Sequence, residues 1–521
     1  MKIKYNQVPV LLALLFSVIF VSCKDEWNNH YFAAAANKSD STMYNYIKSR
    51  SDLEVFAYML QMTGYDTLLN KSQTFTVWAP KNESLLGVNI FDSVAVRKVV
   101  ENHITRFLHT TSGLKSKTIL TMNNKLLSFA KQGDLKTFGG KTIEQADIAT
   151  QNGIVHVLEE YAPYKKNIWE YINETEGLDS LRTYLLSLDS LVFDEKASFK
   201  DEVLVDSVMK KTNIVLDNLA ALDDEDSTYT AILPDNAAWT EAYSRIHPFF
   251  KTLPVEGGAN TQRKYTQLAL VQDLFFRGKL NVPVSVDTLT STNGNKFVNP
   301  NRLFNNAQPA DMSNGTSYVT SQLNSTATES WFKERRIEAE WTAYDRTTGN
   351  YAVAPVTSLG TNFPISNKYY ITLTPTTSSG ISKLFVKFPI PNTLSAKYNV
   401  YCVFVPTAIA DTSDKRPFKV KFYVSYKDAN GTQVTDKGVT LTNTLAASTS
   451  QIGTFTTNPS TMTKMLVLKD FQFPFSNLMY TEDTPISVAL KVENAASPSG
   501  ADLVNFNRTV RIDCIILEPV Q

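Results

Sequence analysis

From Ser41 to about residue 325, apolar residues follow a helical spacing interrupted by short strand patterns, and afterwards they follow a strand spacing. Between Ser51 or Asp52, which are placed to cap a helix, and Gly64, which is placed to end it, apolar side chains recur every three or four positions. The same spacing predicts a helix over residues 92–109. Beyond residue 325, seven short runs rich in Val, Ile, Phe and Tyr are separated by Pro, Gly, Asn and Ser. This pattern predicts an antiparallel β-sandwich.

One short sequence motif, called the opening phrase below, occurs twice in the helical part of the chain. "FTVWAPKN" begins at Phe75 and "YTAILPDN" begins at Tyr229. In each, alternating apolar residues predict a short strand that stops at proline (Pro80, Pro234), and an asparagine follows (Asn82, Asn236). We expect Asn82 to cap the next turn with its side-chain oxygen, so the role of the phrase is structural.

A second short motif, called the closing phrase below, ends each copy of the repeat. Asn152-Gly153 precedes an apolar strand that includes His156, and Asn314-Gly315 precedes the corresponding strand later in the chain. Opening and closing phrases keep nearly the same separation, which indicates an internal repeat of roughly 155 residues.

Together the two phrases resemble the paired signatures of fasciclin domains. Asn102-His103-Ile104 resembles the Tyr-His motif of that family, with Asn in place of Tyr, and the second copy is degenerate, with Tyr318 where His156 stands in the first. The resemblance implies two compact α+β domains, used for adhesion and binding rather than catalysis, over residues 41–165 and 166–325. The signature positions are Phe75, Pro80, Asn82, His103, Asn152, Gly153, His156, Tyr229, Pro234, Asn236, Asn314 and Gly315.

The N-terminus has the pattern of an exported lipoprotein. Lys2 and Lys4 precede an apolar run that is shorter than the roughly 20 residues of a spanning helix, which predicts a signal peptide over residues 1–22. Ser22-Cys23 resembles a bacterial lipobox, so we expect lipid on Cys23 and a tether over residues 23–40. The alternative is an ordinary cleaved signal with an incidental cysteine. "KDEWNNHYF" resembles the export signal of lipoproteins displayed outside the outer membrane, which predicts that location.

The sandwich, predicted over residues 326–521, resembles jelly-roll modules of the carbohydrate-binding kind. Its aromatic residues suit a sugar, because a ring with a polar edge matches the C–H face and hydroxyl rim of a pyranose. The competing interpretation places these rings in the core or in the joint with the second repeat. The candidates are Trp331, Trp341, Tyr344, Tyr369 and Tyr370.

Composition and local sequence exclude several classes of binding partner and of metal or cofactor site. Lys and Arg number 51, and Asp and Glu 51, so no nucleic-acid or polybasic membrane signal exists. Cys402 and Cys514 both fall in predicted strands, and buried free thiols are favoured over a disulfide. The acidic "LDDEDS" loop at residues 222–227 lacks the pattern of a calcium loop and is interpreted as a solvated linker. No metal or cofactor motif is present.

Catalysis is the least favoured function. Neither His103 nor His109 has a metal-ligand partner at a suitable spacing, and both are interpreted as structural. Glu338 and Glu340 alternate on a predicted strand, and a glycosidase would need two carboxylates roughly 5 to 10 Å apart across a cleft.

The fasciclin resemblance and the lipoprotein start together imply an accessory protein of a nutrient-uptake system. In such a system the partners are a SusC-like TonB-dependent transporter and a SusD-like lipoprotein, and the ligand is a glycan or an oligopeptide. The alternative is an adhesin that binds matrix or other cells, and a glycoside hydrolase ranks third. The sequence specifies neither the ligand nor the oligomeric state.

Overall fold

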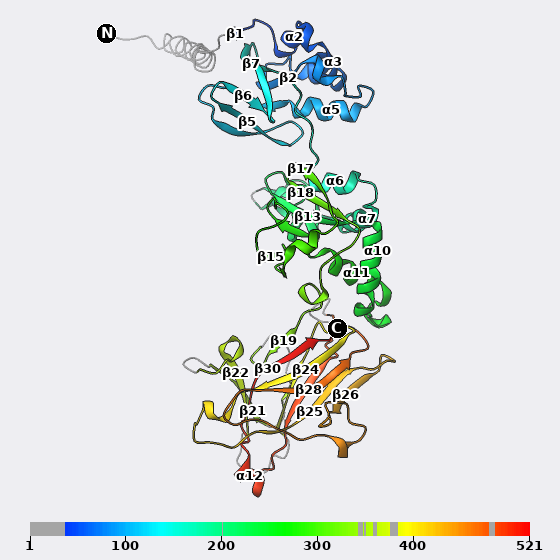
Figure 1. Cartoon of the computed structure of the whole chain (residues 1–521), viewed down its shortest axis with the longest axis vertical. Coiled ribbons are helices and arrows are strands. Elements are labelled where there is room, and N and C mark those ends of the chain that lie inside the picture. The colour runs from blue at the N-terminus through cyan, green and yellow to red at the C-terminus, as the bar shows by residue number, and fades with distance from the viewer. Residues whose placement is uncertain are drawn as a thin grey trace, which may run out of the picture. The chain divides into compact units, whose positions relative to one another are not determined.

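A computed structural model describes residues 37–200, 202–341, 347–348, 351–357, 362–375, 384–478 and 485–520. The described chain forms two compact units, one made of residues 37–171 with 222–228 and 311–315, the other of the remainder (Figure 1). Cys23, Tyr344 and the predicted leader lie outside the described residues. Within the described residues, no helix combines the length and the apolar character that a bilayer crossing requires. The predicted domain boundaries at residues 165 and 325 stay predictions.

The first repeat packs short helices against one mixed sheet. The sheet runs in the order β3-β2-β8-β7-β6-β5-β4, with β2 and β8 parallel. The apolar sides of the helices meet β2 and β8 in a core that includes Phe56, Leu60 and Val155. The helices are α2 (Met43–Lys48), α3 (Glu54–Thr63), α4 (Tyr65–Leu68) and α5 (Ser93–Asn102). The strands are β2 (Phe75–Pro80), β3 (Ile104–Arg106), β4 (Ser116–Leu120), β5 (Leu126–Gln132), β6 (Leu135–Phe138), β7 (Lys141–Thr150) and β8 (Gly153–Leu158).

Two boundaries in this repeat differ from the prediction. Helix α5 ends at Asn102 rather than near His109, because Ile104 leaves the helix to pair with Val77 at the edge of the sheet. The apolar spacing of residues 92–109 is therefore shared between a helix and a strand. The tether is also shorter than predicted, since β1 (Asn37–Lys38) pairs in parallel with β7.

The second repeat reproduces the central strand order of the first. Its sheet runs β14-β13-β18-β17, which corresponds to β3-β2-β8-β7. The helices are α6 (Ile168–Glu174), α7 (Asp179–Ser187), α9 (Ile214–Asn218), α10 (Asn236–Ile246) and α11 (Gly258–Val271). The strands are β13 (Tyr229–Pro234), β14 (Phe275–Arg277), β17 (Gln308–Met312) and β18 (Gly315–Thr320), with a separate pair β15 (Thr288–Thr290) and β16 (Lys296–Val298).

The C-terminal part is a β-sandwich of two six-stranded sheets. The first has the order β21-β22-β30-β24-β28 with β19 beside β30, and the second β20-β23-β29-β25-β26 with β27 beside β25. Phe404 of β24 and Phe422 of β25 lie 6.2 Å apart between ring centroids, so the sheets pack face to face. The longer strands are β21 (Tyr351–Thr357), β22 (Tyr369–Pro375), β23 (Leu384–Pro389), β24 (Lys397–Phe404), β25 (Lys419–Lys427), β26 (Gln433–Gly438), β28 (Thr463–Gln472), β29 (Ala489–Asn494) and β30 (Val510–Pro519). The others are β19 (Arg335–Glu338), β20 (Thr347–Thr348) and β27 (Phe455–Thr456), with helix α12 (Ala501–Asn505).

The cysteines of the sandwich are buried free thiols, as predicted. They lie on the adjacent strands β24 and β30, where Cys402 is opposite Ile515 and Cys514 is opposite Val403. Because successive side chains of a strand point to opposite faces, this one-residue offset puts the two thiols on opposite faces of the sheet. A disulfide between them is excluded by the register.

Candidate functional site

The signature asparagines of the closing phrase cross-link the fold. Asn152 is 6% exposed; its Oδ1 accepts from the N–H of Met43 at 2.9 Å, and its Nδ2 donates to the carbonyls of Leu69 and Lys71 at 2.7 and 2.6 Å. One amide thus satisfies the first turn of α2 and the loop that follows α4, groups that have no partner within a helix.

Asn314 makes the same three contacts in the second repeat. Its Oδ1 accepts from Ile168 N–H at 2.9 Å, and its Nδ2 donates to the carbonyls of Leu222 and Asp224 at 2.8 and 3.0 Å. The repetition of the phrase therefore corresponds to the repetition of a hydrogen-bonded junction.

The asparagine of the opening phrase also stabilises the fold, but its hydrogen-bond partners lie further away in the sequence than predicted. Asn82 does not cap its own turn: its Oδ1 accepts from Val55 N–H at 2.9 Å and its Nδ2 donates to Ser51 O at 2.7 Å, so it caps the start of α3. Asn236 likewise accepts from Ser180 N–H at the start of α7.

Gly153 is required by close packing. It pairs with Phe75 in the parallel ladder of β2 and β8. A Cβ at this position would lie 2.3 Å from Phe75 O and 2.6 Å from the sulfur of Met43, so a larger residue cannot fit without displacing the strand.

The histidines of the first repeat are held by hydrogen bonds within the fold. His103 lies between Val99 O, 2.7 Å from Nδ1, and Ala162 N–H, which donates to Nε2. His156 lies between His109 O and Asp147 N–H in the same way. Burial lowers the pKa of His103 to about 4 and also lowers the pKa of His156. Burial, with help from Lys117, lowers the pKa of His109 to about 4, so all three rings are neutral at pH 7.

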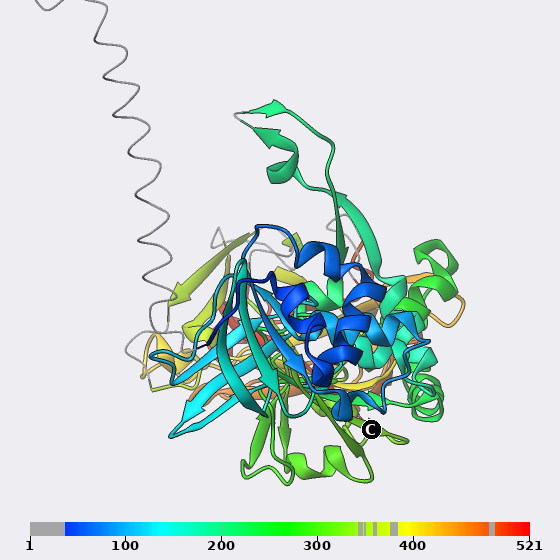
Figure 2. The ribbon, with the colours of Figure 1, turned by 90° about the horizontal axis from the view of Figure 1, so that it is seen from above.

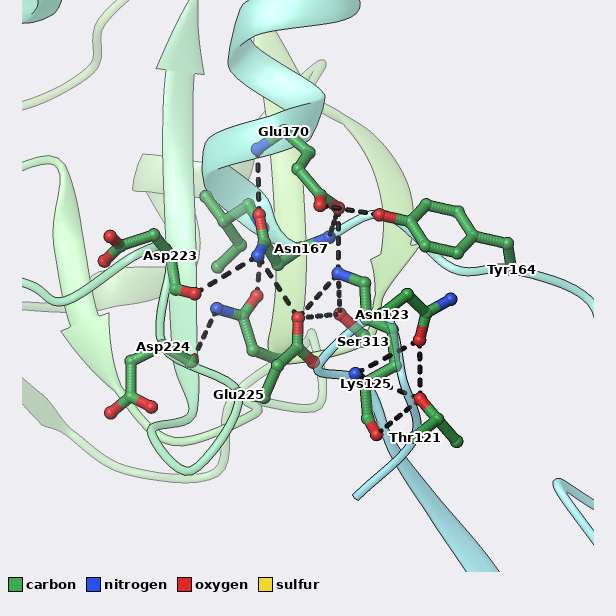
Figure 3. A network of polar contacts seen from close by, with 12 residues as sticks. Thr121, Asn123, Lys125, Tyr164, Asn167, Glu170, Asp223, Asp224, Glu225 and Ser313 are labelled. Carbon is green, nitrogen blue, oxygen red and sulfur yellow. Dashed lines mark hydrogen bonds and ion pairs between the residues drawn. The ribbon is translucent and has the colours of Figure 1, made fainter. Parts of the chain in front are cut away.

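A buried lysine organises a polar network in the first unit (Figure 3). Lys125, whose side chain is 4% exposed, lies 2.8 Å from the Glu170 carboxylate and 2.6 Å from that of Glu225, and its ammonium lies 5.0 Å from the centre of the Tyr164 ring. Ser313 also donates to Glu225 at 3.1 Å. The interpretation of "LDDEDS" as a solvated linker is therefore wrong at Glu225, whose side chain is only 10% exposed.

The five aromatic candidates do not form one surface. Tyr370 is buried between Ile365 and Val405, which removes it as a ligand contact. Trp331 packs on Phe249 of the second repeat at 4.8 Å between ring centroids, as the competing interpretation proposed, and lines a cavity of ≈ 420 Å³ there. Trp341 and Tyr369 remain, each 43% exposed, while Tyr344 lies outside the described residues.

Both exposed rings belong to segments that meet at a cluster of carboxyl groups. Trp341 N–H donates to Glu338 O, and Tyr369 directly follows the turn at Ser366–Lys368. In that turn Ser366 donates its hydroxyl to Glu338 at 2.7 Å and its N–H to Asp513 at 3.1 Å. The segments of β19, β22 and β30 therefore meet at this cluster, and Trp341 and Tyr369 each lie three positions along the sequence from one of its residues, Glu338 and Ser366.

Sequence patterns did not indicate this cluster, because Glu338 and Asp513 are 175 positions apart and meet only through the pairing of β19 with β30. The donor atoms of Glu338, Asp513 and Cys514 lie within 4.8 Å of one another, so among the described residues these could hold a metal ion. One Glu338 oxygen is buried without a hydrogen-bond partner. The carboxylate oxygens suit a hard cation such as Ca²⁺, whereas the buried thiol does not.

The cluster does not have the geometry of a glycosidase. Glu340 follows β19 in a turn rather than alternating with Glu338 on a strand, and its carboxylate accepts from the Asn367 amide. Asp513 is 2% exposed, so it cannot reach a sugar held at the surface.

Stability of the sandwich should fall as pH rises. Burial raises the pKa of Asp513 from 3.8 to about 7; the Ser366 N–H opposes this, and the carboxylates of Glu338 and Glu340 add to it. The folded protein then holds this proton more tightly than the unfolded chain does, so stability is lost between pH of about 4 and 7. With a chelator present at pH 8, Asp513→Asn should raise the melting temperature by on the order of 5 °C.

Asp411→Asn is the matched control, because hydrogen bonds from Ser413 lower the pKa of the exposed Asp411 carboxyl. That variant should not raise the melting temperature. A wild-type protein whose stability relative to that of Asp513→Asn rises between pH 5 and 8 would contradict the assignment. Loss of the pH dependence in millimolar Ca²⁺ would instead identify the cluster as a cation site.

Residues 51–161 match the family model of the fasciclin domain, so the chain contains a fasciclin domain. The match covers the first repeat, which carries the better preserved signatures. No curated protein sequence matches the chain.

Three similar solved structures are distant from this chain. A FAS1 domain pair from the insect cell adhesion molecule fasciclin I is 14% identical with a TM-score of 0.21, over 53% of this chain and 98% of that one. An exo-β-1,3-galactanase from Phanerochaete chrysosporium is 12% identical with a TM-score of 0.17, over 35% of this chain and 28% of that one. A carbohydrate-binding module for non-crystalline cellulose is 8% identical with a TM-score of 0.17, over 36% of this chain and 86% of that one. Likenesses this weak carry no argument about activity.

Proposed function

We propose that the chain is a non-enzymatic binding protein, held at the outer face of an outer membrane by a lipid on Cys23. We propose further that it is an accessory component of a SusC/SusD-like uptake complex for glycans or oligopeptides. Fasciclin domains are non-enzymatic and typical of adhesion and surface proteins, which agrees with the export pattern of residues 1–23.

One observation carries the non-enzymatic part of this proposal. The polar residues of the signatures are engaged inside the fold: Asn152 and Asn314 each satisfy three backbone groups, and His103 and His156 are neutral and buried between backbone groups. What remains at the surface is suited to binding, namely the rings of Trp341 and Tyr369, each 43% exposed. An aromatic face with polar neighbours fits a sugar or a peptide side chain.

An adhesin is the second candidate, because a fasciclin domain suits either function. The two differ in their partners. An uptake accessory associates stably with a transporter in its own membrane, whereas an adhesin binds matrix or another cell.

Purification from native membranes in mild detergent tests the proposal. We expect the wild-type chain to carry fatty acid and to bring down a TonB-dependent transporter with its SusD-like lipoprotein, and Cys23→Ala to appear in the soluble fraction. Recovery of the wild-type chain alone would favour the adhesin. A Cys23→Ala variant that stays in the membrane with labelled fatty acid would refute the anchor.

A further inference from the structure

A hairpin arm leaves the second repeat between α7 and α9. Its stem pairs β9 (Asp189–Phe193) with β12 (Met209–Asn213) in a two-stranded sheet of their own. Its tip holds a turn of helix, α8 (Glu195–Ser198), and the short pair β10 (Phe199–Lys200) and β11 (Val203–Leu204). In Figure 2 the arm is the teal-green ribbon that projects from the other helices and strands.

The first repeat builds the same central strand order without a counterpart of the arm. In the first repeat, 12 positions lead from the end of α3 at Thr63 to the start of β2 at Phe75. In the second, 42 positions lead from the end of α7 at Ser187 to the start of β13 at Tyr229. Both repeats nevertheless build the same central strand order, so the arm is an insertion with another role.

The surface of the arm is unusually apolar. Eight of the 27 large hydrophobic side chains exposed in the described chain lie on residues 191–209, and Leu191 and Val203 are 67% and 63% exposed. On the stem, Phe193 is paired with Met209, and Leu191 lies two positions along on the same face. An isolated two-stranded hairpin is at best marginally stable in water, and contiguous exposed apolar side chains mark interaction sites.

We propose that this arm is the docking element for a separate folded protein that presents an apolar groove bordered by basic residues. Residues 189–213 contain six acidic and four basic side chains, so charged groups of net negative sign surround the apolar ones. An apolar centre with a polar rim is typical of protein interfaces. Eight side chains at roughly 80–100 Å² each supply on the order of 700 Å², close to the contribution of one partner to a stable interface.

The net negative charge of the arm disfavours a lipid surface or a second copy of this chain as its binding partner. An anionic lipid surface is recognised by clusters of Lys and Arg, whereas the four lysines of the arm are outnumbered by its six acidic residues. A second copy of this chain would bring two net-negative arms together, which costs free energy in a desolvated interface. The arm also has an open strand edge on each side of its two-stranded stem, to which a partner strand can add.

This inference rests on the part of the proposed function in which the chain assembles with another protein. Photo-crosslinking of the full chain in its native membrane tests it directly. The probe is p-benzoylphenylalanine at Phe193 and, separately, at Leu204. The control position is Phe91, which is 92% exposed but lies outside the arm.

We expect both arm positions to crosslink to one and the same protein, identified by mass spectrometry, at a site containing Lys or Arg, and the control position to miss it. The purified partner should then bind the full chain and lose at least 100-fold in affinity for a shortened variant. In that variant Asn-Gly replaces residues 191–211, which closes the hairpin between the paired residues Ser190 and Thr212 and keeps the base pair Asp189–Asn213.

Crosslinked homodimers, lipid adducts, or equal binding of the shortened variant would each overturn the docking role. Arm positions that give no product, while the wild-type chain still co-purifies with its transporter, would overturn the arm and leave the proposed function standing. A chain that purifies alone would remove the assembly itself.

Discussion

Asn152→Ala is expected to cost about 3 kcal/mol of folding free energy in the first repeat. The substitution leaves the N–H of Met43 and the carbonyls of Leu69 and Lys71 without their partner in a site that is 6% exposed. Each buried backbone group left unsatisfied costs roughly 1 kcal/mol or more. Urea unfolding of the mature chain should show the loss, and hydrogen exchange should place it in α2 and in the loop after α4.

Asn152→Asp tests the two donated hydrogen bonds separately from the accepted one. An aspartate still accepts from Met43 N–H but cannot donate to the two carbonyls, so it should be at least as destabilising as alanine. Asn314→Ala, which breaks the same three contacts in the second repeat, should cost a similar amount.

The matched control is Asn82→Ala, which removes only the cap of α3 and should cost about 1 kcal/mol. Equal losses for Asn82→Ala and Asn152→Ala would show that the closing phrase is no more important to the fold than the opening one. Unchanged stability in Asn152→Ala with loss of partner binding would reverse the structural assignment.

The repeats were predictable because the residues that define them act locally or through a fixed backbone geometry. Pro80 ends β2, and Gly153 is the only residue that fits against Phe75 O, so both are visible in the printed sequence. The partners of the asparagines were not predictable. Asn82 reaches back 27 positions to Val55, and short-range turn chemistry gave the wrong partner.

Errors in the helical boundaries have a tertiary cause. The spacing of Val100 and Ile104 fits a helix, but Ile104 is needed at the sheet edge opposite Val77, and strand pairing wins over helical periodicity. The arm was missed for a related reason. Its short apolar runs at residues 191–193 and 203–205 look like ordinary strands with a buried face, and only the structure shows that these side chains are exposed.

The candidate site was predictable only in part. Exposed aromatic residues near the start of the sandwich were expected, and Trp341 and Tyr369 are exposed, but residue type alone did not separate them from the buried Tyr370. The carboxyl cluster depends on β30, the last strand, returning beside β19, the first. A contact between residues 175 positions apart has no local signature in one sequence.

Lys125→Met is expected to cost about 3 kcal/mol, because it leaves two carboxylates without their cation. Breaking a buried ion pair by removing one partner typically costs 3–5 kcal/mol, and we take the lower end because Glu170 is 30% exposed. Methionine keeps nearly the length of the lysine stem, so the loss reports on charge more than on packing.

The stability lost in Lys125→Met should depend on pH. Burial alone would raise the pKa of Glu170, but hydrogen bonds from Lys125, Tyr164 and the Asn167 N–H lower it overall from 4.5. The stabilisation is therefore present above pH of about 4.5 and is lost as pH falls through the lowered folded pKa. The difference between wild type and Lys125→Met should be largest near pH 7 and should shrink below pH 4.

Lys165→Met provides the matched control for Lys125→Met. Lys165 pairs with Asp311 at 2.6 Å in the same unit, but both side chains are about half exposed, so the cost should stay within about 1 kcal/mol. Adding Glu225→Gln to Lys125→Met should recover part of the loss, because it removes a carboxylate that the methionine has left unpaired. If Lys125→Met and Lys165→Met cost the same, or if the loss does not change between pH 7 and pH 4, the network does not stabilise this unit through its charges. The expected pattern would mean that the loops at residues 222–228 and 311–315 are held to the first repeat by one buried ammonium group, which turns an acidic stretch of sequence into part of a folded core.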